Sequence, residues 1–284
     1  MKLKEIRYLL LLMVLMSVSN YTYSQNAKEL HFDKQVAYNY KYIIDTNNKD
    51  DIKEEVMVLL LNDSLSLFAS QKRLQTDSSA YDRHKKGVEW VLTTVVLVDN
   101  GVTASTNYQI FKSGNEIRTL DAINGKGVTG NKVINQYDES TEDFDWEILP
   151  DTTRIASYLC QKAKVDYGGR VWYAWFCPEI PLSDGPYTFS GLPGLIFQIH
   201  DEDNYFQFDL MQIQNVNRSV WVNIRPDQTI EKIDKKEFFR NRRKYQDNTY
   251  ELGVTHGVYP QGDEKIREFS KKSAIKNNNW LEKY

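Results

Sequence analysis

Alternation of apolar and polar residues dominates the chain and predicts a protein built mainly from β-strands. From position 36 to position 44, apolar or aromatic residues occupy every second position. This period of two is typical of a half-buried strand, because successive side chains point to opposite faces of a sheet. Turn residues predict two hairpins. One joins 56–61 to 64–70 through Asn62-Asp63, and the other joins 90–98 to 103–111 through Asp99-Asn100-Gly101.

Further strands and a helical C-terminal part complete the predicted fold. The additional strands are expected at 116–123, 132–137, 143–149, 155–164, 170–176, 195–200, 205–213 and 219–224. Segment 71–86 is polar and weakly helical. Asp234, with Glu237 three positions later, indicates a helix to about residue 246, and a second helix is expected at 263–276. Short strands joined by tight turns favour antiparallel pairing, because parallel strands need long crossovers. We therefore predict a mainly β (α+β) fold: a large curved or barrel-like antiparallel sheet with one or two C-terminal helices.

The first 24 residues have the pattern of a secretory signal peptide. Basic residues precede an unbroken apolar run at 9–16, and Thr22-Tyr23-Ser24 forms a small-x-small cleavage signal before Gln25. The apolar run is much shorter than the roughly 20 residues that span a bilayer. We therefore expect residues 25–284 to form one exported domain without a transmembrane segment, since no linker or repeat divides them.

Composition and charge narrow the class of protein. The 284 residues include 18 Tyr, 12 Phe and 6 Trp, which is enough apolar surface to argue against disorder. The formal net charge of -3 provides no basic field, which argues against a nucleic-acid partner.

The two cysteines are placed symmetrically about Gly168-Gly169. A two-residue turn at this pair would put Cys160 opposite Cys177 on neighbouring strands, at a non-hydrogen-bonded position where Cα atoms lie about 4.5 Å apart. That separation suits a disulfide, and the expected export supplies an oxidising compartment. The alternatives are two buried free thiols, or a register with a longer loop. We expect a structural disulfide, because no Cys-x-x-Cys spacing is present.

The most distinctive motif of the chain has six residues: Gly191, Leu192, Pro193, Gly194, Leu195 and Ile196. Pro193 and Gly194 suit the two central positions of a type II turn, with Gly194 at positive φ, that leads directly into a strand. Its three apolar side chains are unusual, since turns are normally polar. Two interpretations remain open: a buried loop that closes the end of the sheet, or a surface that a partner covers.

Together with its surroundings, this motif resembles the GLPGLI family of Bacteroidota. The similar stretches include YLCQKA at 158–163, Gly168-Gly169-Arg170, WYAWFCPEI at 172–180 and Gly185-Pro186-Tyr187. The resemblance implies an exported protein of unknown function, of a type often encoded near outer-membrane TonB-dependent receptors, and it carries no catalytic residues. The C-terminal stretch 277–282 only loosely resembles the family's ending.

Candidate chemistry elsewhere is weak. The G-x-G-x-x-G letters at 125–130 have no helix after them to hold a pyrophosphate, so we interpret them as a loop. Segment 200–203 (His-Asp-Glu-Asp) is interpreted as a solvated hairpin tip, because consecutive side chains diverge and Ca²⁺ needs a wrapped loop. The four histidines are scattered. We therefore assign no catalytic, cofactor-binding or metal-binding residue and expect no cofactor.

Seven basic residues gather between positions 232 and 244. On a helix, Phe238, Phe239 and Arg242 would share one side, and we expect the two rings to dock on the sheet while the cations face solvent. The alternative is contact with anionic lipid head groups or an acidic partner.

Two classes of function fit these patterns. The first is a non-enzymatic exported binding or accessory protein, periplasmic or outer-membrane-associated, whose partner would be a TonB-dependent receptor or another envelope protein. The second is an envelope hydrolase with an unrecognised active site. A binding protein predicts an aromatic concavity without converging titratable groups, whereas a hydrolase predicts carboxylates or histidines with shifted pKa values in a cleft.

Overall fold

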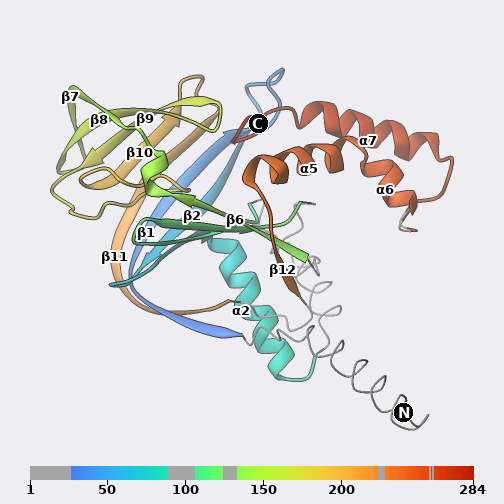
Figure 1. The fold of residues 1–284 in the computed structure, drawn as a ribbon, viewed down its shortest axis with the longest axis horizontal. Helices are drawn as coiled ribbons and strands as arrows, with labels where there is room; N and C mark the ends of the chain where they lie inside the picture. The colour runs from blue at the N-terminus through green and yellow to red at the C-terminus, as the bar shows by residue number, and fades with distance from the viewer. Residues whose placement is uncertain (1–26, 89–105, 124–132, 223–227, 256, 258) are drawn as a thin grey trace, which may run out of the picture.

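The structure is a computed structural model that describes residues 27–88, 106–123, 133–222, 228–255, 257 and 259–284 (Figure 1). Three sequence predictions lie outside this part of the chain: the signal peptide at 1–24, the strand at 90–98 with its Asp99-Asn100-Gly101 turn, and the glycine-rich loop at 125–130.

Strands of the described chain form one large, curved sheet (Figure 1). In chain order they are β1 (Lys28–Ile43), β2 (Ile52–Leu61), β3 (Ser66–Ser70), β4 (Gln109–Ser113), β5 (Glu116–Asp121), β6 (Val133–Ser140), β7 (Glu147–Ile155), β8 (Tyr158–Tyr167), β9 (Arg170–Cys177), β10 (Leu195–Asp201), β11 (Phe206–Val222) and β12 (Thr229–Lys232). The spatial order is β12-β6-β5-β4-β3-β2-β1-β11-β10-β9-β8-β7. This open order confirms the curved mainly β fold, and the barrel-like alternative does not apply because β12 and β7 are edges.

Pairing is antiparallel throughout the described sheet except at one edge. There β12 runs parallel to β6, with Thr229 opposite Val133. Parallel neighbours need a long crossover, and the chain between β6 and β12 supplies one by passing through the other half of the sheet. The sheet is therefore mixed, whereas the sequence predicted antiparallel pairing alone.

The centre of the sheet is the pairing of β1 with β11, in which Lys28 lies opposite Val222 and Tyr42 opposite Phe206. The sequence predicted two strands here, 205–213 and 219–224, and this was wrong. The polar residues between them remain in the strand because the backbone ladder to β1 continues, with register shifts at Phe32/Lys34 and Ala37/Tyr38.

Apolar side chains cover both faces of the central strands. Met57 and Leu59 of β2 lie in the larger core with Tyr38 and Trp172. Their neighbours Val58 and Leu60 point to the opposite face, where they pack with Leu74 of α2. Because both faces of β2 are buried, its sequence is an uninterrupted apolar run instead of an alternating one.

Helices lie outside the sheet (Figure 1). Helix α2 (Gln71–Lys85) packs on β2, β3 and β11, and α5 (Lys235–Asp247) packs on β6. Two further helices, α6 (Thr249–Thr255) and α7 (Glu264–Lys276), pack with α5. Side chains of Asp234 and Asp263 cap α5 and α7, which confirms both predicted helices, while α6 was missed.

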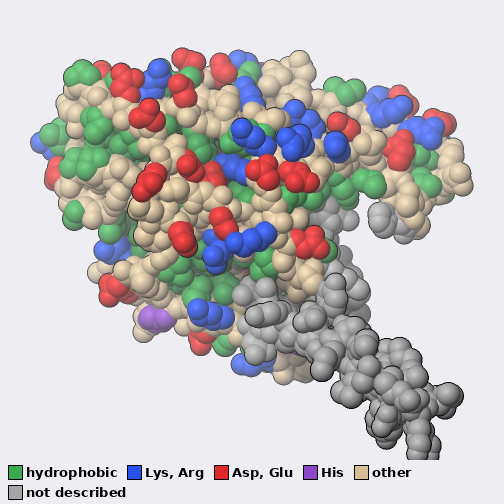
Figure 2. Space-filling model, in the orientation of Figure 1, with side chains coloured by type: hydrophobic (Ala, Val, Ile, Leu, Met, Phe, Trp, Pro, Cys, Tyr) green, Lys and Arg blue, Asp and Glu red, His purple; other side chains and the backbone are tan. Residues whose placement is uncertain are grey.

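No helix of the described chain combines the length and the apolarity needed to cross a membrane. Lys, Arg, Asp and Glu side chains are interspersed over the face shown in Figure 2. Neither sign of charge therefore dominates that face.

Candidate functional site

The hairpin of β8 and β9 has the predicted turn and the predicted disulfide. Gly168 and Gly169 adopt φ values of 60° and 72°, and Tyr167 lies opposite Arg170. Cys160 and Cys177 are buried and bonded to each other, with Cα atoms 4.2 Å apart. The prediction that a two-residue turn at Gly168-Gly169 pairs the two cysteines is confirmed, and the free-thiol alternative does not apply.

The Gly191–Ile196 motif folds into a tighter turn than predicted. The Gly194 amide donates to the Leu192 carbonyl at 2.8 Å, across Pro193 alone, while the Leu195 amide donates to Ile180 at 3.0 Å. The type II turn was therefore wrong, because the Leu195 amide that would close it bonds to the loop after β9 and the φ of Gly194 is 156° instead of about 80°. Gly194 has φ of 156°, and a Cβ there would lie 2.4 Å from the Cys177 carbonyl oxygen. Glycine is required by this close approach.

Apolar side chains of the motif are directed into the core. Leu192 is 1% exposed, and Leu195 and Ile196 are fully buried. The hydroxyl of Tyr38 donates to the Ile196 carbonyl at 2.8 Å, which ties the motif to the central strand β1. Of the two interpretations, the structure matches the buried loop, and these side chains leave no apolar surface for a partner.

The Arg170 side chain binds the C-terminal segment that follows α7. Its guanidinium donates to the carbonyls of Trp280 at 2.6 Å and Leu281 at 3.2 Å, and also to the Asn279 side chain. The same group pairs with Asp201 at 2.8 Å, and Asp201 is only 1% exposed. The predicted solvated tip was therefore wrong for Asp201, since a partner 31 residues away neutralises it inside the protein.

Other residues of the family-like pattern hold the same C-terminal segment. The Lys283 amide donates to the Gly168 carbonyl at 2.7 Å, and a Cβ on Gly169 would lie 2.7 Å from the Lys283 oxygen. The Tyr187 hydroxyl hydrogen-bonds the Glu282 carboxylate. Gly168-Gly169-Arg170 and Tyr187 thus form the docking site of this segment.

A buried ionic cluster fixes the end of the segment. Lys235 Nζ lies 2.7 Å from Glu282 Oε2 and 2.5 Å from Glu139 Oε1. Burial, with repulsion from Glu139, raises the pKa of Glu282 despite the opposing effect of Lys235. The expectation that the cations of α5 face solvent was wrong for Lys235, which these two carboxylates draw inward, and for Arg242, which pairs with the buried carboxylate of Asp121. The docking of Phe238 and Phe239 is confirmed, since both are buried against Tyr137 of β6.

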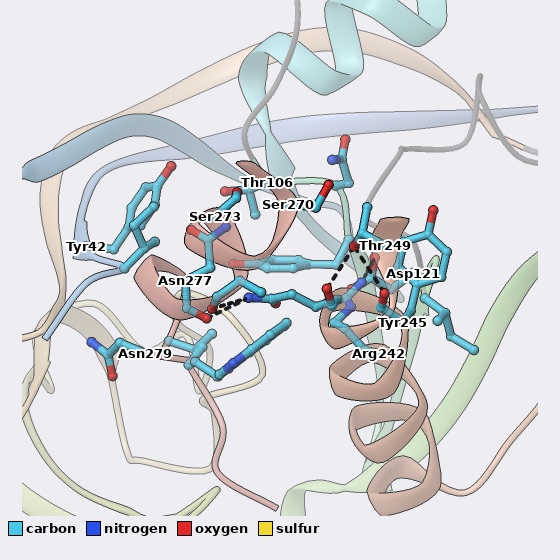
Figure 3. Close-up of a pocket in the computed structure, with 18 of the residues that line it drawn as sticks. Tyr42, Thr106, Asp121, Arg242, Tyr245, Thr249, Ser270, Ser273, Asn277 and Asn279 are labelled. Carbon is cyan, nitrogen blue, oxygen red and sulfur yellow. Dashed lines mark hydrogen bonds and ion pairs between the residues drawn. The ribbon is translucent and has the colours of Figure 1, made fainter. Parts of the chain in front are cut away.

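A cleft of about 850 Å³ lies between the sheet, the C-terminal helices and the docked C-terminal segment (Figure 3). Its walls come from the end of β1, residues 106–108 before β4, the end of β5, helices α5 to α7 and residues 279–281. These parts are distant in sequence, so the sheet order and the anchoring by Arg170 create the cleft. Its size falls within the range of small-molecule sites.

One acid and one base occur among the described lining residues, and they are paired. Asp121 lies 2.7 Å from Arg242 (Figure 3). Arg242 also donates to the Ala122 carbonyl at 2.6 Å. Burial is the largest influence on the pKa of Arg242 and lowers it, but the charge of Asp121, the hydrogen bond to Asp121 and the nearby tyrosines together outweigh burial, so the net shift is upward. Because these opposite charges face each other at 2.7 Å, the pair offers no net charge to a ligand.

Neutral polar groups and aromatic rings make up most of the remaining surface. Ser270, Ser273 and Asn277 extend from α7 toward the cleft (Figure 3). Phe269 on the same helix is 73% exposed, and Trp280, which also lines the cleft, is half-buried. The sequence analysis missed all of these residues. The one signal that the sequence offered was Phe269, a large aromatic residue within the mostly polar and charged segment 264–276.

None of the sequence-predicted site residues lines the cleft. The disulfide and the Gly191–Ile196 motif lie in the core of the sheet. Their connection with the cleft is indirect, through Arg170 and the segment it binds, which contributes Asn279, Trp280 and Leu281 to the lining. Within the described chain, no cluster of three or more His, Cys, Asp or Glu residues has the arrangement of a metal site.

Comparisons with known proteins give a short match and a distant fold similarity. The model of a family described as a protein of unknown function (Porph_ging) matches residues 169–198, which include β9 and the Gly191–Ile196 motif. Membership of the GLPGLI family stays a prediction. No curated protein matches the chain.

Among solved structures, PNGF-II in two space groups is similar at 11% identity and a TM-score of 0.49. These matches cover 76% of this chain but only 34% and 33% of the respective PNGF-II chains. The chain thus spans about a third of the length of these structures.

Proposed function

We propose that this protein is an exported, non-enzymatic binding protein of the cell envelope and that the cleft holds its ligand. The observation that carries the proposal is the character of the lining. Aromatic and neutral polar groups surround a space of about 850 Å³, and the acid and the base among the described lining residues neutralise each other. This arrangement suits recognition, whereas acid–base catalysis needs a titratable group free to exchange a proton with substrate.

Location in the envelope is supported by two further features. The Cys160–Cys177 disulfide suits an oxidising compartment, and the first 24 residues have the pattern of a signal peptide. Membership of the GLPGLI family, and with it a link to an outer-membrane TonB-dependent receptor, belongs to the same proposal. The resemblance of the 158–196 region supports it, and the match to a family of unknown function overlaps that region.

The hydrolase alternative has less support. Carboxylates gather at Glu139 and Glu282, where the pKa of Glu282 is raised, but neither residue lines the cleft. Glu282 is 1% exposed, so its carboxylate has no access to a substrate. Its partners Lys235 and Tyr187 hold the C-terminal segment in place, which is a structural role.

A ligand screen by thermal unfolding tests the proposal. A ligand at 100 times its Kd should stabilise the folded protein by about 2.7 kcal/mol and raise Tm by a few degrees. Ser273→Trp places an indole in the cleft and should abolish the shift. Lys272→Trp is the matched control, because Lys272 is adjacent on α7, is exposed and does not line the cleft.

Recovery of the ligand by mass spectrometry separates binding from catalysis. The proposal predicts that the ligand is recovered chemically unchanged after prolonged incubation. Shifts that Ser273→Trp leaves intact would contradict the assignment of the cleft. Conversion of the ligand would contradict the non-enzymatic function.

A further inference from the structure

We propose, on the basis of the binding function above, that the cleft is a site for a neutral oligosaccharide. The ligand class follows from three properties of the lining: its charge, its hydrogen-bonding groups and its exposed aromatic surface. Each property restricts the chemistry of the occupant.

The first property is charge: the described lining residues offer no unpaired charge to an ionic ligand. Binding an anion or a cation in a partly enclosed site requires an unpaired opposite charge, since desolvation of an uncompensated ion is costly. Asp121 and Arg242 lie 2.7 Å apart, and the Arg242 side chain is only 16% exposed. The nitrogen that faces Asp121, Nη2 of Arg242, also donates to the Ala122 carbonyl. A ligand that carries no net charge leaves this pair intact.

Hydrogen-bonding groups in the cleft suit hydroxyls. Ser270 and Ser273 are three residues apart on α7, and Asn277, the residue that caps the helix, follows four residues later, so the three lie about one turn apart on one side. Within the described chain, the hydroxyls of Ser270 and Ser273 make no hydrogen bond with another residue, so both remain available. Hydroxyl and amide groups donate and accept at once, which matches the donor and acceptor character of sugar hydroxyls.

Aromatic rings supply the apolar part of the site. Phe269 is 73% exposed although it lines the cleft, and Trp280 and Tyr245 are half-buried on neighbouring walls. Sugar rings have apolar C–H faces and polar hydroxyl edges. In one site, the faces can pack on aromatic rings while the edges hydrogen-bond with the serine and asparagine side chains. A purely apolar ligand would leave the serine and asparagine groups without partners, which costs free energy for each group that is desolvated.

Construction of the cleft also fits binding in a preformed site. Helix α7 packs on α5 and α6, and the segment after it is anchored to the sheet by Arg170 and by Asn279, whose side chain donates to the Ile43 carbonyl at 2.6 Å. The Trp280 wall is therefore held in position before binding. Preorganisation of this kind lowers the entropic cost of association.

Isothermal titration calorimetry on the mature chain tests this inference with three groups of probes. The neutral group is cellohexaose, maltohexaose and chitohexaose, the anionic group is oligogalacturonate, and the peptide group is a capped, uncharged Gly/Ser/Tyr hexapeptide. The expected result is binding of at least one neutral oligosaccharide and of neither other probe. Phe269→Ala should weaken that binding about tenfold, which corresponds to about 1.4 kcal/mol, through loss of one ring face.

Ile275→Ala is the matched control. Ile275 is 68% exposed on the same helix but does not line the cleft, so its removal should leave affinity unchanged. Both substituted side chains are exposed, and both variants should keep the Tm of the parent protein.

Each contrary result has a distinct meaning. Binding of oligogalacturonate or of the peptide without binding of a neutral oligosaccharide overturns the ligand class but leaves the binding function standing. Neutral-oligosaccharide binding that is insensitive to Phe269→Ala, or absent for all three sugars, also overturns the inference. Failure of the binding function itself would instead appear as the absence of any Ser273→Trp-sensitive ligand in the wider thermal screen.

Discussion

Gly194→Ala should destabilise the protein much more than the same substitution at Gly114. Both glycines have positive φ, 156° at Gly194 and 57° at Gly114, so an alanine is strained at either position. Such strain costs roughly 1 kcal/mol. The difference lies in the surroundings, since a Cβ on Gly114 would meet nothing within 4 Å.

At Gly194 the added Cβ would collide with backbone. It would lie 2.4 Å from the carbonyl oxygen of Cys177, 2.6 Å from its carbonyl carbon and 2.8 Å from the nitrogen of Pro178. These atoms have little freedom to move, because Cys177 is disulfide-bonded and lies opposite Leu195 in the β9–β10 pair. Overpacking typically adds about 1–3 kcal/mol, so we expect a total cost of about 2–4 kcal/mol for Gly194→Ala.

Urea unfolding of the two variants and the parent protein measures this difference. With an m-value of about 2 kcal/mol/M, the additional cost at Gly194 corresponds to a midpoint lower by about 1 M than that of Gly114→Ala. An equal midpoint for the two variants would refute the reasoning, because it would mean that the close approach of Gly194 to the Cys177 backbone does not exist in solution.

Three further predictions concern export, the disulfide and the C-terminal segment. Intact-mass measurement on protein from its native host should place the N-terminus at or near Gln25; retention of the initiator methionine would contradict export. Non-reducing peptide mapping should find Cys160 joined to Cys177, and loss of this bond should cost on the order of 3 kcal/mol; alkylation of both thiols in the native protein would contradict the register of the hairpin. Arg170→Met should cost about 3–5 kcal/mol, because it leaves Asp201 buried without its partner, and should speed hydrogen exchange in the C-terminal segment; unchanged exchange there would show that the segment is held by other contacts.

Local features of the sequence predicted the local features of the fold. The glycine pair at 168–169 set the β8–β9 register, and with it the cysteine pairing, because a two-residue turn leaves one register for its flanking strands. Asp234 and Asp263 marked the helix starts for a similar reason, since a capping side chain bonds to an amide only two or three residues away.

Features that depend on distant residues were missed. The polar residues in the middle of β11 predict a break in the strand. They stay extended because they pair with β1, which is far away in the sequence. The local sequence around Asp201 predicts a solvated charge, because its partner Arg170 is 31 residues away in the chain. The turn at Pro193 was wrong for the same reason, since the amide of Leu195 bonds to Ile180 and leaves the local turn incomplete.

The cleft is the clearest example of a feature that depends on residues distant in sequence. Phe269, Trp280 and Tyr245 belong to three elements, and nothing in their local sequence brings them together. Their arrangement depends on the C-terminal segment, which Arg170 and Tyr187 bind through its backbone carbonyls and one carboxylate. Main-chain acceptors are present in every sequence, so residue patterns do not reveal this docking.

The ionic cluster that ends the C-terminal segment predicts how stability depends on pH. Glu282 shares Lys235 with Glu139, and two carboxylates face one ammonium group in a buried site. Tyr187 and Tyr284 also face the Glu282 carboxylate. Burial and the repulsion from Glu139 raise the pKa of Glu282 above its ordinary value of 4.5.

A carboxyl whose pKa is raised on folding binds its proton more tightly in the folded protein. Its contribution to the free energy of unfolding is therefore fully present below pH 4.5 and is lost as the pH rises through the folded pKa, with a slope of at most about 1.4 kcal/mol per pH unit. Glu282→Gln removes this titration, so its stability relative to the parent protein should improve as the pH rises, as measured by urea midpoints from pH 4 to 8. Glu268→Gln, at an exposed carboxylate on α7, should show no such trend. A relative stability of Glu282→Gln that falls with rising pH would mean that Lys235 dominates the site and lowers the pKa of Glu282 instead.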